Sequence, residues 1–207
     1  MDLFLKAGPF VWPIVIASII GFARFLERAH TFFRYRSADG ELVGEVIGLV
    51  STGRTTEAAD LCKRTVGPVA KVVGSVVRAL GRPGDEREQI VTVAGNREIR
   101  DMEHGLRSIA VIARIAPLLG LLGTVVGLVE AFRAVSTMQG PPDPSVLASG
   151  IWQALLTTVA GLLVAIPAII SHEWLQSRID ELAIRMQEAV TEVLAALGGS
   201  SNPSQKS

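Results

Sequence analysis

Two threonines lie near the centres of long apolar segments, where a hydroxyl can do chemistry that its neighbours cannot. Thr124 falls within the uncharged run 115–129, and Thr158 falls within the uncharged run 144–171. A hydroxyl both donates and accepts hydrogen bonds, so it can contact a carboxyl group in either protonation state without burying a charge. If the two segments form neighbouring antiparallel helices, both hydroxyls lie at similar depth and line one polar site. The alternative is that each hydroxyl simply bonds a carbonyl oxygen of its own helix.

Other residues of the same two segments extend this hypothesis. Thr157 and Gln153 would lengthen a polar lining, although Gln153 could instead hydrogen-bond a neighbouring helix. Close helix packing is predicted at the small residues, namely Gly120, Gly123, Gly127, Ala154 and Gly161. Neither segment has a charged or histidine side chain near its middle, where a proton relay normally needs a titratable group. If protons cross here, a partner protein must supply the carboxylate.

The composition excludes several classes of protein. The 207 residues are 49% hydrophobic and only 19% charged, which excludes disorder for most of the chain, and 20 basic residues balance 20 acidic ones, which leaves no basic footprint for nucleic acid. One cysteine and three scattered histidines predict neither a disulfide nor a metal site. The apolar segments contain no Ser–His or Ser–Lys pair, no paired aspartates and no HExxH motif. We therefore expect no catalytic residues and no cofactor, and a protein that is not an enzyme.

The mean hydropathy of +0.40 indicates a membrane protein. A bilayer core of about 30 Å needs about 20 mostly apolar helical residues. A third uncharged run, 7–23, is expected to be a retained helix rather than a signal peptide, because Asp2 and Lys6 make a poor basic leader. The fold class expected is all-α, with three transmembrane helices and long helices that extend into a cytoplasmic helical domain.

Basic residues flank the apolar runs on one side and so predict the orientation. They follow the first run and precede the second, at Arg24, Arg28, Arg34, Arg36, Arg97, Arg100, Arg107 and Arg114. By the positive-inside rule, that side is cytoplasmic and the amino terminus is external. The predicted organisation is an external N-terminus with transmembrane helix 1 in 1–26, a cytoplasmic helical domain in 27–107, transmembrane helices 2 and 3 in 108–171 with an external loop at 134–147, a cytoplasmic helix in 172–197 and a disordered tail in 198–207.

Helix signals also divide the cytoplasmic region. Short helices are expected over 41–50, 55–63 and 68–80. A Ser-Thr-Gly sequence at 51–53 separates the first two, and a Gly-Arg-Pro-Gly sequence at 81–84 closes the third. A long helix is expected from residue 85 onwards, entering the membrane without a break.

Three segments carry a family resemblance. The sequence APLLGLLGTVVG at 116–127, followed by Ala131-Phe132, resembles the second-helix signature of the ExbB/TolQ/MotA proton-channel family. The sequence QALLTTVAGL at 153–162, with AIPA at 165–168, is similar to the third-helix signature. GPFVWP at 8–13 and LER at 26–28 resemble the start of many ExbB-like chains, which favours an ExbB-like over a TolQ-like member.

The resemblance implies a multi-pass subunit of a bacterial inner membrane, with a periplasmic N-terminus and a cytoplasmic C-terminus. It implies that five copies surround two transmembrane helices of an ExbD/TolR-like single-span partner, whose aspartate carries the proton beside Thr124 and Thr158. Proton flow would then energise a TonB- or TolA-like protein for transport across the envelope. Gln153 departs from the glutamate of many members. The alternatives are a TolQ-type subunit for envelope maintenance and a structural membrane scaffold that conducts nothing.

Overall fold

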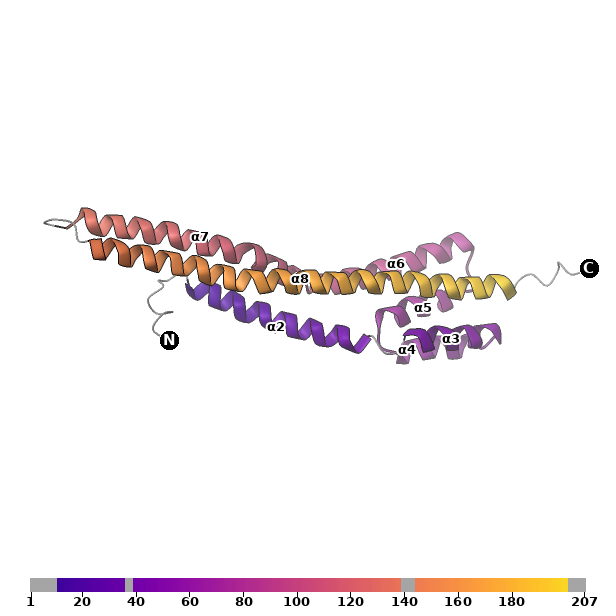
Figure 1. The fold of residues 1–207 in the computed structure, drawn as a ribbon. Coiled ribbons are helices and arrows are strands. Elements are labelled where there is room, and N and C mark those ends of the chain that lie inside the picture. The colour runs from indigo at the N-terminus through magenta and orange to yellow at the C-terminus, as the bar shows by residue number, and fades with distance from the viewer. Residues whose placement is uncertain (1–10, 36–38, 139–143, 201–207) are drawn as a thin grey trace, which may run out of the picture. The chain divides into compact units, whose positions relative to one another are not determined.

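The chain is α-helical throughout its described part. The structure is a computed structural model that describes residues 11–35, 39–138 and 144–200, and within these ranges no strand occurs (Figure 1). The all-α prediction is therefore confirmed. The chain divides into two compact units, of which the first comprises Met1–Glu27 and Gly105–Trp174 and the second comprises Arg28–His104 and Leu175–Ser207.

Two helical stretches are long and apolar enough to cross a membrane. By length and composition these are Gly84–Ser136 and Pro144–Leu197, which include α7 (Arg107–Ser136) and most of α8 (Pro144–Ser200). The first apolar run belongs to α2 (Val11–Tyr35), and its residues 7–10 lie outside the described part of the chain. The described part of α2 does not meet the same criterion, because charged residues begin at Arg24.

The first unit packs α2, α7 and the beginning of α8 together. Gly21 of α2 lies against the side chain of Ile112 on α7. The rings of Phe25 on α2 and Trp174 on α8 meet edge to face, with centroids 6.1 Å apart. α7 and the first half of α8 run side by side (Figure 1). Their closest contacts, described below, show that the two helices are antiparallel.

The second unit is a small helical domain built around one buried helix. It contains α3 (Asp39–Ser51), α4 (Thr55–Arg64), α5 (Pro68–Arg78) and α6 (Gly84–His104), together with the last part of α8. The first three helices match the predicted ranges to within two residues at each end. Nearly every residue of α5 is buried, including its valines, and each buried valine contributes about 1.5–3 kcal/mol of transfer free energy. α5 therefore supplies much of the core of this unit.

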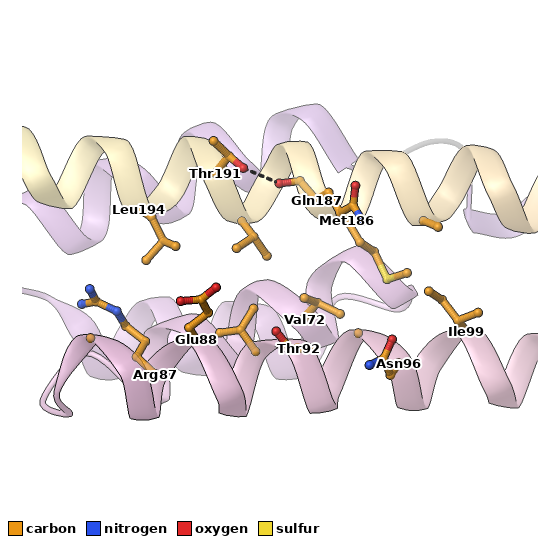
Figure 2. A pocket seen from close by; sticks show the side chains of 15 residues that line it. Val72, Arg87, Glu88, Thr92, Asn96, Ile99, Met186, Gln187, Thr191 and Leu194 are labelled. Atoms are coloured by element: carbon orange, nitrogen blue, oxygen red, sulfur yellow. Dashed lines mark hydrogen bonds between the residues drawn. The ribbon is translucent and has the colours of Figure 1, made fainter.

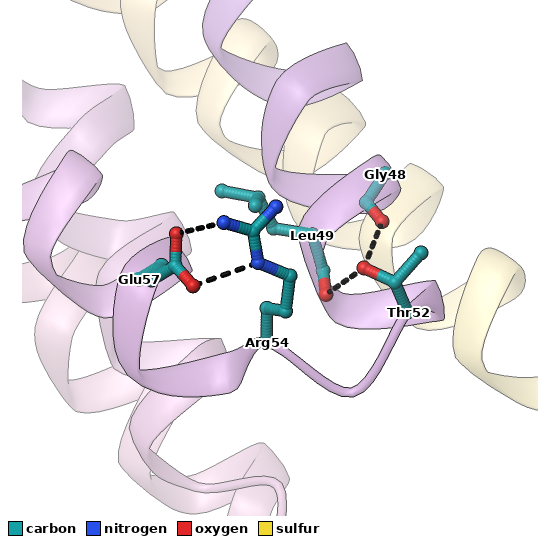
Figure 3. Close-up of polar contacts among 5 residues, drawn as sticks. All are labelled: Gly48, Leu49, Thr52, Arg54 and Glu57. Carbon is teal, nitrogen blue, oxygen red and sulfur yellow. Dashed lines mark hydrogen bonds and ion pairs between the residues drawn. The ribbon is translucent and has the colours of Figure 1, made fainter.

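Local polar contacts fix the turn between α3 and α4 (Figure 3). Gly53 has a φ of +78°, a left-handed conformation that glycine adopts without strain. The Thr52 hydroxyl lies 3.0 Å from the carbonyl oxygens of both Gly48 and Leu49 at the end of α3. Arg54 Nε donates to Glu57 Oε1 at 2.7 Å in the first turn of α4. The Thr52 hydroxyl thus adds a partner for carbonyl oxygens at the end of α3, whereas Arg54 and Glu57 pair through their side chains alone.

Three boundaries differ from the sequence-based expectation. The helix expected to run unbroken from residue 85 is interrupted by a turn at Gly105 and Leu106, where glycine lowers helix propensity. α7 and α8 extend into the expected loop 134–147, so that the segment between them covers 137–143, of which residues 139–143 lie outside the described part. α8 continues to Ser200, three residues into the segment expected to be a disordered tail.

Candidate functional site

The contact between α7 and α8 is lined by small residues. Gly120 of α7 lies against Gly161 of α8, Gly127 lies against Ala154, and Ala131 lies against Gly150. Residue numbers rise along α7 as they fall along α8, so the two helices are antiparallel. Small residues at every third or fourth position allow two helix backbones to approach closely, a pattern that is typical of helix pairs in membranes.

The backbones approach so closely that a side chain would not fit. A Cβ atom added to Gly161 would lie 2.6 Å from the carbonyl oxygen of Ala116. A Cβ atom added to Gly120 would lie 3.0 Å from the carbonyl oxygen of Thr157. Each glycine therefore faces a main-chain oxygen of the other helix, which cannot move away as a flexible side chain could.

Thr157 is buried inside this helix contact. The residue is only 3% exposed. Its Oγ1 lies 2.7 Å from the carbonyl oxygen of Ala154 on the same helix and 3.3 Å from that of Gly120 on α7. A hydroxyl has one proton, so the shorter contact with Ala154 is the main hydrogen bond. Gly123 leaves the space that this side chain occupies, because a Cβ atom on Gly123 would lie 2.5 Å from Thr157 Oγ1.

Thr158, the next residue, is half-buried at the edge of the contact. Its Oγ1 donates a hydrogen bond to the carbonyl oxygen of Gly120 across 3.1 Å. The bond joins α8 to α7. It also uses the only proton of the hydroxyl and leaves the oxygen lone pairs available to accept a hydrogen bond.

Thr124 lies one helical turn after Gly120 and is also half-buried. Its Oγ1 donates to the carbonyl oxygen of Leu121 on its own helix at 2.6 Å, so the local alternative considered for this hydroxyl is the one observed. As with Thr158, the donated proton goes to the main chain and the lone pairs remain available. Both hydroxyls can therefore accept a hydrogen bond from a group outside the helix pair.

Helix geometry places Thr124 and Thr158 on the same edge of the helix pair. At 3.6 residues per turn, Thr124 is rotated about 40° from Gly120, and Thr158 is rotated about 60° from Gly161. Both rotations have the same sign, and in antiparallel helices that meet at Gly120 and Gly161 this puts both side chains on one edge. The sequence predicts that the two threonines lie at a similar depth along the helix pair. The helix geometry adds that both side chains lie on the same edge of that pair.

Gln153 lies elsewhere. It is exposed, and the five residues that separate it from Thr158 rotate it about 140° around α8, toward the other edge of the helix pair. Of the four residues predicted to line a polar pathway, the structure therefore brings together Thr124, Thr157 and Thr158, with Thr157 inside the contact, and leaves Gln153 apart. Whether any of them lines a pathway stays a prediction.

Sequence reasoning missed the main-chain acceptor at the centre of this site and two alanines of the contact. The carbonyl oxygen of Gly120 is approached by two hydroxyls of the other helix. Ala116 and Ala131 extend the glycine series of α7 at the same three- and four-residue spacing, and this spacing could have identified them. No sequence pattern identifies the Gly120 carbonyl as an acceptor, because which hydroxyls of α8 reach it depends on the register between α7 and α8.

The polar groups of this site cannot titrate. The sequence has no charged residue from 115 to 129 or from 144 to 171. The described residues also contain no group of three or more His, Cys, Asp or Glu that could hold a metal ion. The arrangement can therefore accept or donate hydrogen bonds but cannot itself gain or lose a proton near neutral pH.

A separate cavity of about 550 Å³ lies in the second unit, where side chains of α6 and α8 face each other (Figure 2). Its wall is mostly apolar and includes Val72, Met186 and Leu194, and Arg87 and Glu88 lie at one end. None of the predicted site residues lines it, and its charged groups balance. It offers no chemistry that would make it the principal site.

Comparison with known proteins identifies the family. A model of the MotA/TolQ/ExbB proton channel family matches residues 66–188, which is more than half of the chain. An ExbB homolog of Methanothermobacter thermautotrophicus is 30% identical over 182 residues, covering 87% of this chain, and the chain spans 64% of that relative's own length. Biopolymer transport protein exbB1 of Vibrio cholerae is 28% identical over 94% of this chain and 86% of its own. The Tol-Pal system protein TolQ of Haemophilus influenzae is 28% identical over 88% of this chain and 86% of its own. The chain thus belongs to the MotA/TolQ/ExbB proton channel family.

Proposed function

We propose that this chain is a subunit of an inner-membrane proton channel that uses the protonmotive force to drive transport across the cell envelope. Membership of the proton channel family and two helices able to cross a membrane support this function. The observation that carries it is the shared edge of Thr124 and Thr158, whose hydroxyls donate to main-chain carbonyls and have lone pairs free to accept a hydrogen bond from a group outside the helix pair. A proton moving down the potential releases about 2.3 kcal/mol per 100 mV, which is enough to drive a conformational step.

In this proposal the chain crosses the membrane three times. α7 and the first part of α8 are two of the spans, and α2 is the first. Large apolar side chains are exposed along α2 at Trp12, Ile16, Ile19 and Phe22, as expected of a helix that faces lipid or a neighbouring subunit. The excess of arginine after α2 and before α7 supports a cytoplasmic second unit and a periplasmic N-terminus.

The channel requires a carboxylate from another protein. Neither α7 nor α8 has a titratable side chain near its middle, so an ExbD/TolR-like single-span partner supplies it, inside a ring of five copies of this chain. Thr124 and Thr158 donate to main-chain carbonyls, so they accept a hydrogen bond from the protonated carboxyl group and stabilise its neutral form. Thr157 holds the two helices in register behind them. Gln153, on the other edge, contacts a neighbouring copy.

The test is proton flux in liposomes that contain the chain together with its single-span partner. Thr124→Val and Thr158→Val remove the hydroxyls and nearly preserve shape, and loss of a hydrogen bond worth about 1.4 kcal/mol lowers the flux about tenfold. Thr158→Ser keeps the hydroxyl and retains flux. Thr191→Val is the matched control, because this exposed hydroxyl of α8 bonds the Gln187 carbonyl at 2.8 Å in the second unit.

The alternative function is a structural scaffold. It is favoured by the observation that the hydroxyls of Thr124, Thr157 and Thr158 all donate to main-chain carbonyls within the helix pair. A scaffold predicts normal assembly of both valine variants and no proton flux above background for the unmodified complex. That result would overturn the channel. If the channel is supported, copurification distinguishes its two possible roles: a TonB-like partner indicates an ExbB-type role, and a TolA-like partner indicates a TolQ-type role.

A further inference from the structure

Each helix of the α7–α8 pair has an exposed face that is mostly apolar and has one charged residue at its end. On α7 we call it the Arg107 face, and it consists of Arg107, Val111, Leu118, Val125 and Val129. On α8 we call it the Glu173 face, and it consists of Trp152, Leu163, Ile166, Ile170 and Glu173. Every apolar residue of both faces is more than half exposed, and both charged residues are exposed as well.

Helix geometry places the two faces on opposite sides of the helix pair. At 3.6 residues per turn, the nine positions from Gly120 to Val111 correspond to a rotation of about 180°, and so do the nine from Gly161 to Ile170. The charged residue of each face lies within about 60° of the same direction and is turned toward the edge that carries the two threonines. If this edge faces a pore inside a ring of copies, each face is therefore turned toward a neighbouring copy.

The register between α7 and α8 places the two charged residues at one level. Gly120 lies against Gly161, and this register continues along the contact described above. Arg107 lies 13 positions before Gly120, and Glu173 lies 12 positions after Gly161. At 1.5 Å per residue, Arg107 and Glu173 therefore lie within about 2 Å of the same level along the helix pair.

The charges of the two faces are complementary. The sequence contains no Asp or Glu from residue 107 to residue 129, and no Lys or Arg from residue 144 to residue 177. Among the described residues Arg107 forms no ion pair, and the ring nitrogen Nδ1 of His172 lies 3.5 Å from Oε1 of Glu173, whose side chain stays 73% exposed. A cation on one face and an anion at the same level on the other fit a head-to-tail contact, in which unlike faces of identical chains meet.

We propose that the Arg107 face of one copy docks on the Glu173 face of the next copy, with an ion pair between Arg107 and Glu173 across the junction. The proposal rests on the ring of copies proposed above. Rotation about an axis parallel to the helices keeps every residue at its own level, so apolar residues at one level also meet, as Val111 does with Ile170. Packing of the large side chains holds the copies together, and the ion pair fixes the level at which they meet.

The first experiment cross-links the junction in the complex of this chain with its single-span partner. Arg107→Cys and Glu173→Cys are combined in a Cys62→Ser background and treated with a short bismaleimide. The two cysteines lie on opposite sides of one helix pair, so the reagent joins different copies and is expected to give a covalent ladder that rises to five copies. Each cysteine alone is the matched control and gives no ladder, because identical positions do not meet in a head-to-tail contact. Dimers from a single-cysteine variant would show a two-fold contact and overturn the proposal.

The second experiment reverses the charges and measures the fraction of the complex at its full native mass. Arg107→Glu or Glu173→Arg alone places like charges at the junction and is expected to lower that fraction at least about fivefold. The double variant Arg107→Glu, Glu173→Arg restores it, which also excludes misfolding as the cause. Arg64→Glu is the control, because this exposed arginine of α4 has no ion pair among the described residues. Single reversals without effect, or a double variant without recovery, would overturn the ion pair.

Failure of the junction can be distinguished from failure of the proposed function. A complex that keeps several copies and conducts protons, but gives no ladder, would overturn the docking of these two faces and leave the channel standing. A native mass that corresponds to one copy of this chain would overturn the ring and the junction together.

Discussion

Gly161 of α8 lies directly against the carbonyl oxygen of Ala116 on α7, and a Cβ atom on Gly161 would approach that oxygen to 2.6 Å. The contact joins two backbones, so neither side can yield by rotating a side chain. Thr158 lies three residues before Gly161 on α8, and Gly120 lies four residues after Ala116 on α7. The contact therefore also sets the distance between the Thr158 hydroxyl and the Gly120 carbonyl oxygen. The hydroxyl edge of the helix pair therefore depends on this glycine.

Gly161→Ala is expected to destabilise the helix pair by about 1–3 kcal/mol, because the added methyl group pushes α8 away from α7. The measurement is the thermal unfolding midpoint of the purified protein in detergent. Gly44→Ala is the matched control, since Gly44 is exposed in α3 with nothing within 4 Å of its added Cβ atom. That change should stabilise α3 by about 0.5–1 kcal/mol. Equal effects of the two changes would contradict the close contact.

Gly150 and Ala131 form a pair that can be exchanged. A methyl group on Gly150 would overlap the side chain of Ala131, so Gly150→Ala alone lowers stability. The double variant Gly150→Ala, Ala131→Gly moves the methyl group from one helix to the other and recovers at least about 1 kcal/mol of the loss. A double-mutant cycle of unfolding free energies measures this coupling. If the changes in unfolding free energy of Gly150→Ala and Ala131→Gly simply add in the double variant, the two helices do not meet at this pair.

The sequence predicted the elements far better than the contacts. The three short helices were predictable because glycine, serine and proline mark their ends, and each begins and ends within two residues of its predicted range. Thr157 and Thr158 could not be told apart in the sequence, since both are threonines in an apolar run. One residue rotates a helix by about 100°, and this places Thr157 inside the α7 contact and Thr158 at its edge.

The glycines were recognisable as packing residues, but their partners were not. Which residue of α8 meets Gly120 depends on the register between two helices, and the sequence of each helix alone does not define that register. Gln153 illustrates the consequence. The sequence allows Gln153 either to extend the polar lining or to hydrogen-bond a neighbouring helix, and the orientation of α8 turns it toward the edge opposite Thr158.

Glu181 predicts a dependence of stability on pH. Hydrogen bonds from Arg178 and from Arg185, each 2.7 Å long, hold the pKa of the Glu181 carboxyl below its ordinary value of 4.5. A lowered pKa in the folded state gives stabilisation that is present above pH 4.5 and is lost as the pH falls through the lowered value. Glu181→Gln should therefore lower the melting temperature by about 1–2 °C at pH 7. The difference from the unmodified protein should disappear on acidification to pH about 2.

Glu188→Gln is the control for this effect. Glu188 is exposed on the same helix and forms no ion pair with another described residue. Its removal should leave the melting temperature unchanged over the same pH range. A constant difference between Glu181→Gln and the unmodified protein at every pH would show that the side chain acts through packing rather than charge.

Cys62 should be unreactive toward thiol reagents. It is buried in α4, and burial raises the pKa of its thiol above the ordinary value of 9.0 although the nearby Arg78 acts in the opposite direction. Both burial and a smaller thiolate fraction slow alkylation, so labelling at pH 8 is expected to be at least about tenfold slower than at an exposed cysteine. The comparison is Thr52→Cys in a Cys62→Ser background, because Thr52 is exposed at the end of α3. Unfolding the second unit should abolish the difference, and equal rates in the folded protein would contradict the buried position of Cys62.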